Sequence, residues 1–310
     1  MNLMTLLLLL LMSPSLAAAP PHPLLDTLWE GASRQPLVQA HLQQRVLESR
    51  WILLGEVHGN PVHHARQLEV LQWLRASGQT PTVAFEIFDQ TDQAAMTQFI
   101  ETGSGDAAAL GQQLDMEARG WPFASYQPLV QYALDEGLPI LAVNLSRAQA
   151  QRVAREGPDG LESVPVRQLL QQHPLATEVQ EALYAHIFAA HCEYLPKAHV
   201  PAVALAQQAR DATIAWFLQQ ASSSGPVVLI SGAGHVRKDY GVPFYLQALD
   251  PEHAPLSVGF IEIHSERSTL EAYLHGPEGA PYDVLWFSAR TSPEDPCVAF
   301  REQLEQMRGE

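Results

Sequence analysis

A carboxylate and an imidazole stand directly after one of the most apolar segments of the chain. Glu56 and His58 follow the segment Trp51–Leu54, and two more histidines, His63 and His64, come soon after. An apolar run that ends in this way is typical of a buried strand. In an open α/β sheet the carboxyl ends of the strands are where ligands bind. Glu56 and His58 are therefore candidates for proton transfer or metal binding.

Polar residues also lie within or just after three other apolar segments. Glu86 lies inside one run, Arg147 comes just beyond a second, and His235 follows a third after two glycines. In a parallel sheet these ends share one edge, so the side chains are expected to converge with Glu56 and His58. A buried carboxylate needs a charged or hydrogen-bonding partner. The pattern predicts either ion pairs with Arg147 or a divalent-metal site formed by Glu56, His58, Glu86 and His235.

Each of these residues also has a simpler interpretation. Glu86 would be a structural carboxylate if it accepted hydrogen bonds from backbone N–H groups. His235 would be a capping residue if a helix began there. His63 and His64 fall in the first turn of an expected helix and would face solvent if that turn were exposed. Convergence of several such residues is stronger evidence for a site than any one position.

A second group of chemically active residues lies in the segment between the third and fourth expected strands. Haem iron takes histidine or tyrosine as an axial ligand, and an apolar helical cap that carries both would suit a porphyrin. Ordinary amphipathic packing is the alternative for each residue. His191 and Tyr184 rank first because their neighbours are apolar. The group comprises Tyr184, His186, His191, Tyr194 and His199.

The elements that position these residues alternate between strands and helices, which predicts an α/β fold with a mainly parallel sheet and flanking helices. Helical spacing occurs in 62–76, 126–136 and 204–220, with Asn60 and Pro61 suited to start the first of these helices. Residues 146–225 exceed one crossover and predict a helical cap. The last two strands are expected to form an antiparallel edge around a turn at 276–281. The expected strands are 51–54, 82–88, 139–145, 226–231, 257–264 and 283–288.

Composition limits the classes of protein to which the chain can belong. Residues 1–19 carry no charged side chain and resemble a secretory signal peptide, which leaves 20–310 as a single domain. No cysteine lies near the expected cleavage site, so a periplasmic protein without a lipid anchor is expected. The net charge of -16 disfavours nucleic acid as a partner. Cys192 and Cys297 are the two cysteines and could pair in an oxidising compartment.

Short motifs occur along the chain at 54–58, 63–64, 84–86, 120–122, 126–128, 142–147, 191–196, 207–212, 232–235, 241–243 and 282–287. Together they resemble the motifs of the ChaN-like haem-binding lipoproteins, within a superfamily that includes erythromycin-esterase-like hydrolases and Tiki-type metalloproteases. The resemblance implies an envelope protein of haem or iron acquisition, with an α/β sheet and a helical cap, haem held between two protomers, and a haem-uptake receptor or transporter as partner. The missing anchor cysteine departs from the lipoprotein members.

Two functions compete on these observations. In the first, haem is bound by His191 or Tyr184, and arginines such as Arg147 and Arg210 meet its propionates. In the second, a divalent metal makes the protein a hydrolase. Its catalytic residues would be Glu56, Glu86 and Arg147, the arginine stabilising an oxyanion. The resemblance favours haem binding, whereas the strand-end residues alone favour hydrolysis.

Overall fold

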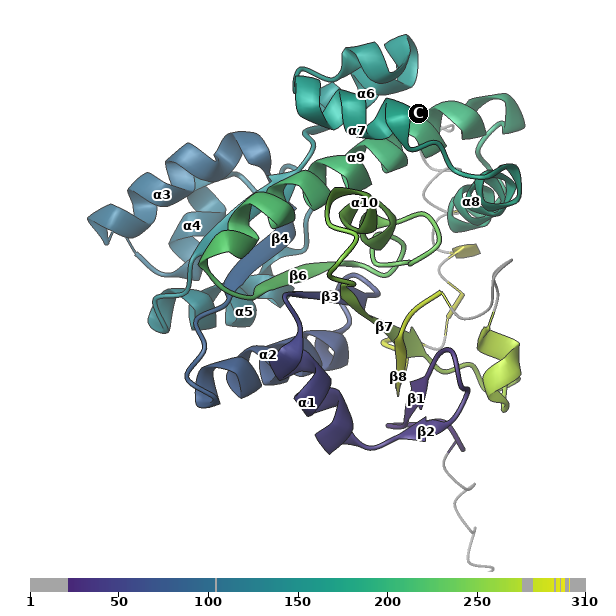
Figure 1. Ribbon diagram of the computed structural model, residues 1–310, viewed down its shortest axis with the longest axis horizontal. Coiled ribbons are helices and arrows are strands. Elements are labelled where there is room, and N and C mark those ends of the chain that lie inside the picture. Colours follow the sequence, from purple (N-terminus) through teal and green to yellow (C-terminus); the bar gives the residue numbers. More distant parts are fainter. Residues whose placement is uncertain are drawn as a thin grey trace, which may run out of the picture.

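The structure is a computed structural model that describes residues 22–103, 105–274, 281–292, 294–295, 297–298 and 301 (Figure 1). The expected signal peptide at 1–19 and residues 276–280 of the expected turn lie outside the described residues. Among the described residues, no helix combines the length and apolar character needed to cross a membrane.

One eight-stranded sheet forms the centre of the molecule. Its strands pair in the order β2-β1-β8-β7-β3-β6-β4-β5, and all pairs from β8 to β5 are parallel. The strands are β1 (Leu28–Glu30), β2 (Pro36–Leu37), β3 (Trp51–Glu56), β4 (Thr82–Asp89), β5 (Ile140–Asn144), β6 (Val227–Gly232), β7 (Leu256–Glu262) and β8 (Val284–Ser288).

The six expected strands are confirmed, but the expected antiparallel edge is wrong. β7 and β8 pair in parallel, from Val258 with Val284 to Glu262 with Ser288. A parallel pair needs a connection much longer than a hairpin turn, and residues 263–283 between the two strands provide it. The antiparallel pairs lie at the other side of β8, where β1 pairs with β8 and β2 pairs with β1.

Helices cover both faces of the sheet, which explains why its strands are apolar on both sides. In β3, Ile52 and Leu54 join a core with α1, α2 and α5, whereas Trp51 and Leu53 join a second core with α9 and α10. The helices are α1 (Gln39–Glu48), α2 (Pro61–Ala76), α3 (Gln93–Thr102), α4 (Ala107–Gln113), α5 (Phe123–Asp135), α6 (Arg147–Glu156), α7 (Val164–Gln172), α8 (Thr177–Ala190), α9 (Val200–Ala221) and α10 (Val242–Leu249).

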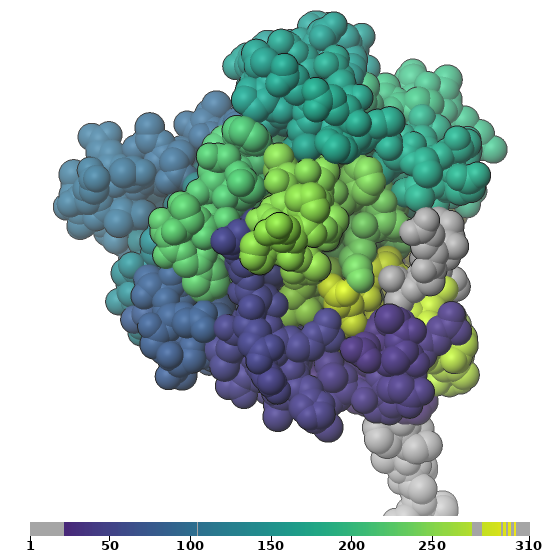
Figure 2. All heavy atoms as spheres, in the orientation of Figure 1, coloured from purple at the N-terminus to yellow at the C-terminus, as the bar shows by residue number. Residues whose placement is uncertain are grey.

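The segment between β5 and β6 forms the helical cap. Its last helix, α9, returns along the sheet and packs against β4, β5 and β6, while α6, α7 and α8 pack on α9 (Figure 1). In the space-filling view these three helices, in teal, form a separate layer beside the green α9 and α10 (Figure 2). The cap thus places α8 and the start of α6 next to the carboxyl ends of the strands.

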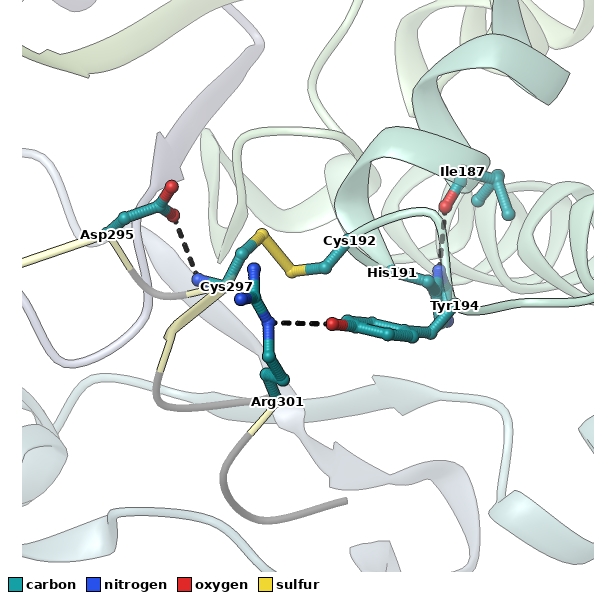
Figure 3. The surroundings of a disulfide bond; sticks show 7 residues. All are labelled: Ile187, His191, Cys192, Tyr194, Asp295, Cys297 and Arg301. Carbon is teal, nitrogen blue, oxygen red and sulfur yellow. Dashed lines mark hydrogen bonds between the residues drawn. A yellow bond between two sulfur atoms is a disulfide. The ribbon is translucent and has the colours of Figure 1, made fainter. Parts of the chain in front are cut away.

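A disulfide between Cys192 and Cys297 ties the cap to the C-terminal part of the chain, as Figure 3 shows. Cys192 follows the end of α8, and the neighbouring Tyr194 hydroxyl accepts a hydrogen bond from Arg301 Nε at 2.8 Å. The two cysteines, whose pairing the sequence alone did not decide, are therefore bonded. The bond closes a loop with a sequence separation of 105 residues.

Candidate functional site

Glu56, the last residue of β3, is fully surrounded by hydrogen-bonding side chains. Its Oε1 accepts a hydrogen bond from the hydroxyl of Tyr126 and lies 3.0 Å from His58 Nδ1. Its Oε2 accepts from Gln67 Nε2 at 2.8 Å and lies 3.2 Å from His64 Nε2. Burial would raise the pKa of Glu56, but the hydrogen bonds from His58 and His64 outweigh it and lower that pKa to about 2. Glu56 is therefore an ionised acceptor that orients His58.

The two histidines of α2 are buried and serve different purposes. The helix starts as expected, with Asn60 Oδ1 accepting from the N–H of Val62 at 2.9 Å. His63 accepts from Val57 N–H through Nδ1 at 3.0 Å, and burial lowers its pKa to about 4. His63 is thus a neutral structural side chain. His64 donates from Nδ1 to the carbonyl of Ser125 at 2.8 Å and directs Nε2 at Glu56, so neither imidazole faces solvent.

Glu86 and His235 form a second buried group. His235 Nε2 lies 3.1 Å from Glu86 Oε1, and His235 Nδ1 lies 2.5 Å from Asp211 Oδ1. Burial would lower the pKa of His235, but the charges of Glu86 and Asp211 raise it to about 10. Burial raises the pKa of Asp211 to about 6, against the opposing effect of His235. His235 is therefore a cation held between two carboxylates.

The two groups meet at Gly232, the residue of β6 that pairs with Glu56. Its N–H donates to Glu86 Oε2 at 2.7 Å. This is the backbone hydrogen bond that a structural role for the Glu86 carboxylate requires. A Cβ atom on Gly232 would lie 2.9 Å from His58 Nε2, so only glycine leaves room for the imidazole. The predicted ligands Glu56, His58, Glu86 and His235 thus converge, but as two hydrogen-bonded pairs. Among the described residues, no group of three or more such side chains is arranged to hold a metal ion.

We expect Gly232→Ala to displace His58 while the fold is retained, because the backbone of Gly232 is compatible with alanine and the imidazole is partly exposed. Burial lowers the pKa of His58, but the hydrogen bond that it donates to Glu56 and the charge of Glu86 raise this pKa above the usual value. Displacement should therefore bring this pKa down toward that of a free histidine. Histidine Cε1–H signals in an NMR pH titration report the change.

Gly234→Ala is the matched control, since its Cβ would make an ordinary contact, 3.7 Å from His186 Nε2. It should leave the titration of His58 unchanged. An unaltered His58 titration in Gly232→Ala would contradict the role assigned to the glycine.

The third predicted catalytic residue, Arg147, does not contact either pair among the described residues. It lies at the start of α6 and lines a cavity of ≈ 590 Å³ together with Trp121 and Arg210. The expected convergence of Arg147 with Glu56 and Glu86 is therefore not observed, and Arg147 instead lies beside Asn144, at the end of β5. Trp121 lies between this cavity and the strand-end pairs, since its ring centroid lies 5.4 Å from that of His58.

The predicted haem ligands lie on α8 or at its end. His191 is half-buried and its Nδ1 donates to the carbonyl of Ile187 at 2.7 Å (Figure 3). Tyr184, two turns earlier on the helix, is half-buried beside an apolar cluster. His186 is the residue of this group that reaches the strand ends, through its approach to Gly234. The predicted haem contact Arg210 lies on α9, where Nη1 donates to Asn144 Oδ1 at 2.6 Å.

Several partners in the site had no role assigned from the sequence. Gln207 and Asp211, one turn apart on α9, both contact His235, and that spacing was a signal that both would lie on one helix face. Tyr126 and Gln67 contact Glu56 through packing of α5 and α2. Tyr126 begins the motif 126–128, whereas for Gln67 the sequence contains no signal beyond its helical position.

Comparison with known proteins identifies the fold. A solved structure titled "Cofacial heme binding to ChaN of Campylobacter jejuni" matches with a TM-score of 0.67 and 18% identity, covering 84% of this chain and 95% of that chain. An erythromycin esterase mutant in its open conformation matches with a TM-score of 0.42 and 12% identity, over 77% of this chain and 78% of its own.

A curated relative, Protein RETICULATA-RELATED 5, chloroplastic, from Arabidopsis thaliana, is 24% identical over 269 residues, which are 79% of this chain and 35% of the relative. The chain thus spans about a third of the length of that relative. The family described as "Haem-binding uptake, Tiki superfamily, ChaN" matches residues 42–246, which include both strand-end pairs and the cap. Since this match covers more than half of the chain, the protein belongs to the ChaN family of the Tiki superfamily.

Proposed function

We propose that the protein binds haem on the face where the carboxyl ends of the strands meet α8. The observation that carries this proposal is the match to the haem-binding ChaN family over residues 42–246. The likeness in fold to a chain whose title names haem is consistent with it. We propose binding of haem only and assign no reaction to it.

The residues present on this face fit haem. Histidine and tyrosine are axial ligands of haem iron, and α8 supplies Tyr184, His186 and His191 within two turns. His191 uses Nδ1 for a backbone carbonyl, which leaves Nε2 as the nitrogen suited to a ligand. Burial and the charge of Arg237 lower the pKa of His186, so this imidazole stays neutral, as a ligand must. His191 and Tyr184 remain the predicted ligands, and we propose His186 as a third candidate because it approaches Gly234.

The experiment is a hemin titration of the mature protein followed by its Soret absorbance. We expect saturable binding in the wild type and a displaced Soret band in the variant that lacks the axial ligand, among Tyr184→Phe, His186→Ala and His191→Ala. The double variant Glu56→Gln/Glu86→Gln runs alongside. Retained hemin binding in that variant would show that haem does not depend on the strand-end carboxylates. Loss of binding would show that haem and these carboxylates share one pocket.

A wild-type protein that shows no saturable Soret change would contradict the proposal. His173→Ala is a suitable control for the α8 variants, because His173 lies at the end of α7 and lines a different cavity. It should bind hemin as the wild type does. An equal loss in this control would show that the α8 variants act by nonspecific weakening of surface contacts.

We also propose that the protein acts in the periplasm during haem or iron acquisition, with a haem-uptake receptor or transporter as partner and as a homodimer when haem-bound. The signal-like segment 1–19 and the disulfide support an oxidising compartment. N-terminal sequencing of the exported protein should find Pro20 as the first residue. An uncleaved chain in the cytoplasm would contradict this location.

The metal-dependent hydrolase stays a prediction. Its carboxylates and imidazoles are engaged with one another and with Tyr126, Gln67 and Asp211. A hydrolysis screen with the Glu56→Gln variant as the inactive control tests it separately from hemin binding.

A further inference from the structure

Three guanidinium groups line one cavity of a chain whose net charge is -16. The cavity has a volume of ≈ 590 Å³ and is lined by Arg119, Arg147 and Arg210, together with Trp121, Asn144 and Asp89. This volume is within the range of small-molecule sites. The concentration of positive charge at one place in an acidic protein points to an anionic ligand.

The three arginines differ in how far their charge is already neutralised. Arg119 is committed to structure, since its Nη2 lies 2.7 Å from Asp89 Oδ2 and its Nη1 lies 2.8 Å from Asp92 Oδ2. This pairing also neutralises Asp89 at the cavity wall. Arg119 therefore adds little attraction for a ligand.

Arg210 and Arg147 retain their charge. Nη1 of Arg210 donates to two neutral oxygens, Asn144 Oδ1 at 2.6 Å and the carbonyl of Leu145 at 2.7 Å, so its guanidinium is fixed in place without a carboxylate partner. Arg147 is exposed, and within the described ranges its guanidinium forms no ion pair. Because an arginine presents five N–H donors, both side chains have donors left for a ligand carboxylate.

Two further features favour a planar anion here. Arg147 is the first residue of α6, a ten-residue helix capped by Ser146, and the N-terminus of a helix attracts negative charge. Trp121 forms another part of the wall and contacts His58. An aromatic ring of this kind packs against the face of a conjugated ligand, while the arginines bind carboxylates at its edge.

We propose that this arginine cavity binds the propionate carboxylates of haem and so sets the orientation of the macrocycle on the strand-end face. The inference rests on the proposed function and extends it to a defined part of the ligand. In this proposal the unpaired guanidinium of Arg147 attracts the carboxylates, and the fixed guanidinium of Arg210 donates hydrogen bonds to them. The ring of Trp121 packs against the macrocycle.

The test compares hemin with hemin dimethyl ester, which lacks both free carboxylates, in Soret titrations of four proteins. These are the wild type, Arg147→Ala, Arg147→Glu and Arg155→Glu. Arg155 lies on the same helix, is exposed and does not line the cavity, so it matches Arg147→Glu in overall charge. We expect the Kd for hemin to rise about tenfold in Arg147→Ala, as the loss of a charged hydrogen bond implies, and further in Arg147→Glu.

Arg155→Glu should bind hemin as the wild type does, and all four proteins should bind the dimethyl ester with one Kd. Equal hemin affinity in Arg147→Glu and Arg155→Glu would overturn the inference while haem binding stands. Equal weakening of hemin and ester would also overturn it, because the carboxylates would then not be recognised. A wild type that binds neither compound would overturn both the inference and the proposed function.

Discussion

Replacing His235 with alanine is expected to lower the free energy of unfolding by about 3–5 kcal/mol, the usual cost of removing one partner of a buried ion pair. The imidazole lies between the carboxylates of Glu86 and Asp211, all three of which are buried. Without it the two carboxylates would be buried with no cation between them. Urea denaturation followed by circular dichroism measures the change.

His253→Ala provides the control, since His253 also lies beside a carboxylate, Asp250, but half of its side chain is exposed. Its removal should be nearly neutral, as is common for exposed ion pairs. Adding Glu86→Gln to His235→Ala should restore part of the lost stability by removing one buried charge. A His235→Ala protein as stable as the wild type would contradict the ion-pair assignment.

The same group predicts how stability depends on pH. The pKa of His235 is about 10 in the folded protein and about 6.5 in an unfolded chain, so the folded state holds the proton more tightly. Its contribution is complete below about pH 6.5 and is lost as pH rises through about 10. Wild-type stability should therefore fall between about pH 7 and 10, and His235→Gln should lack this fall. A parallel decline in both proteins would rule out His235 as its source.

Removal of the disulfide is expected to destabilise the protein by a similar amount, about 2–5 kcal/mol in Cys192→Ser/Cys297→Ser. The bond closes a loop with a sequence separation of 105 residues, and a large loop restricts the unfolded chain strongly. It also holds the C-terminal segment against the end of α8 (Figure 3). Thermal unfolding by calorimetry measures the loss.

The wild type reduced with dithiothreitol should unfold at the temperature of the double variant, which separates the effect of the bond from that of the serines. The single variants test for a destabilising free thiol. An unchanged unfolding temperature in the double variant would show that contacts such as that between Tyr194 and Arg301 hold the segment without the bond.

The sequence predicts the fold well wherever local periodicity decides the structure. Apolar runs bounded by polar residues locate the six long strands, and Asn60 with Pro61 locates the start of α2. Three- and two-residue strands such as β1 and β2 carry too short a pattern to be recognised. The direction of β8 relative to β7 depends on which neighbours the strands find in the sheet, and no local pattern encodes that choice.

Four residues of the candidate site were predictable from the sequence, but their pairing and their helical partners were not. Glu56, His58, Glu86 and His235 do converge, because parallel strands end at one edge. Which imidazole faces which carboxylate depends on the register of β3 with β6 and on Asp211 of α9. That register places a glycine, Gly232, between the two pairs, and further partners of the pairs come from the helices α2, α5 and α9.

The strand order has a consequence for how the chain folds during synthesis. The central strand β3 pairs with β6 and β7, so it has no neighbouring strand until the last third of the chain has been made. Long-range pairing of this kind is slow and leaves strand edges exposed in the meantime. Until β6 has been made, β3 therefore has two unpaired edges, which are open to pairing with another chain.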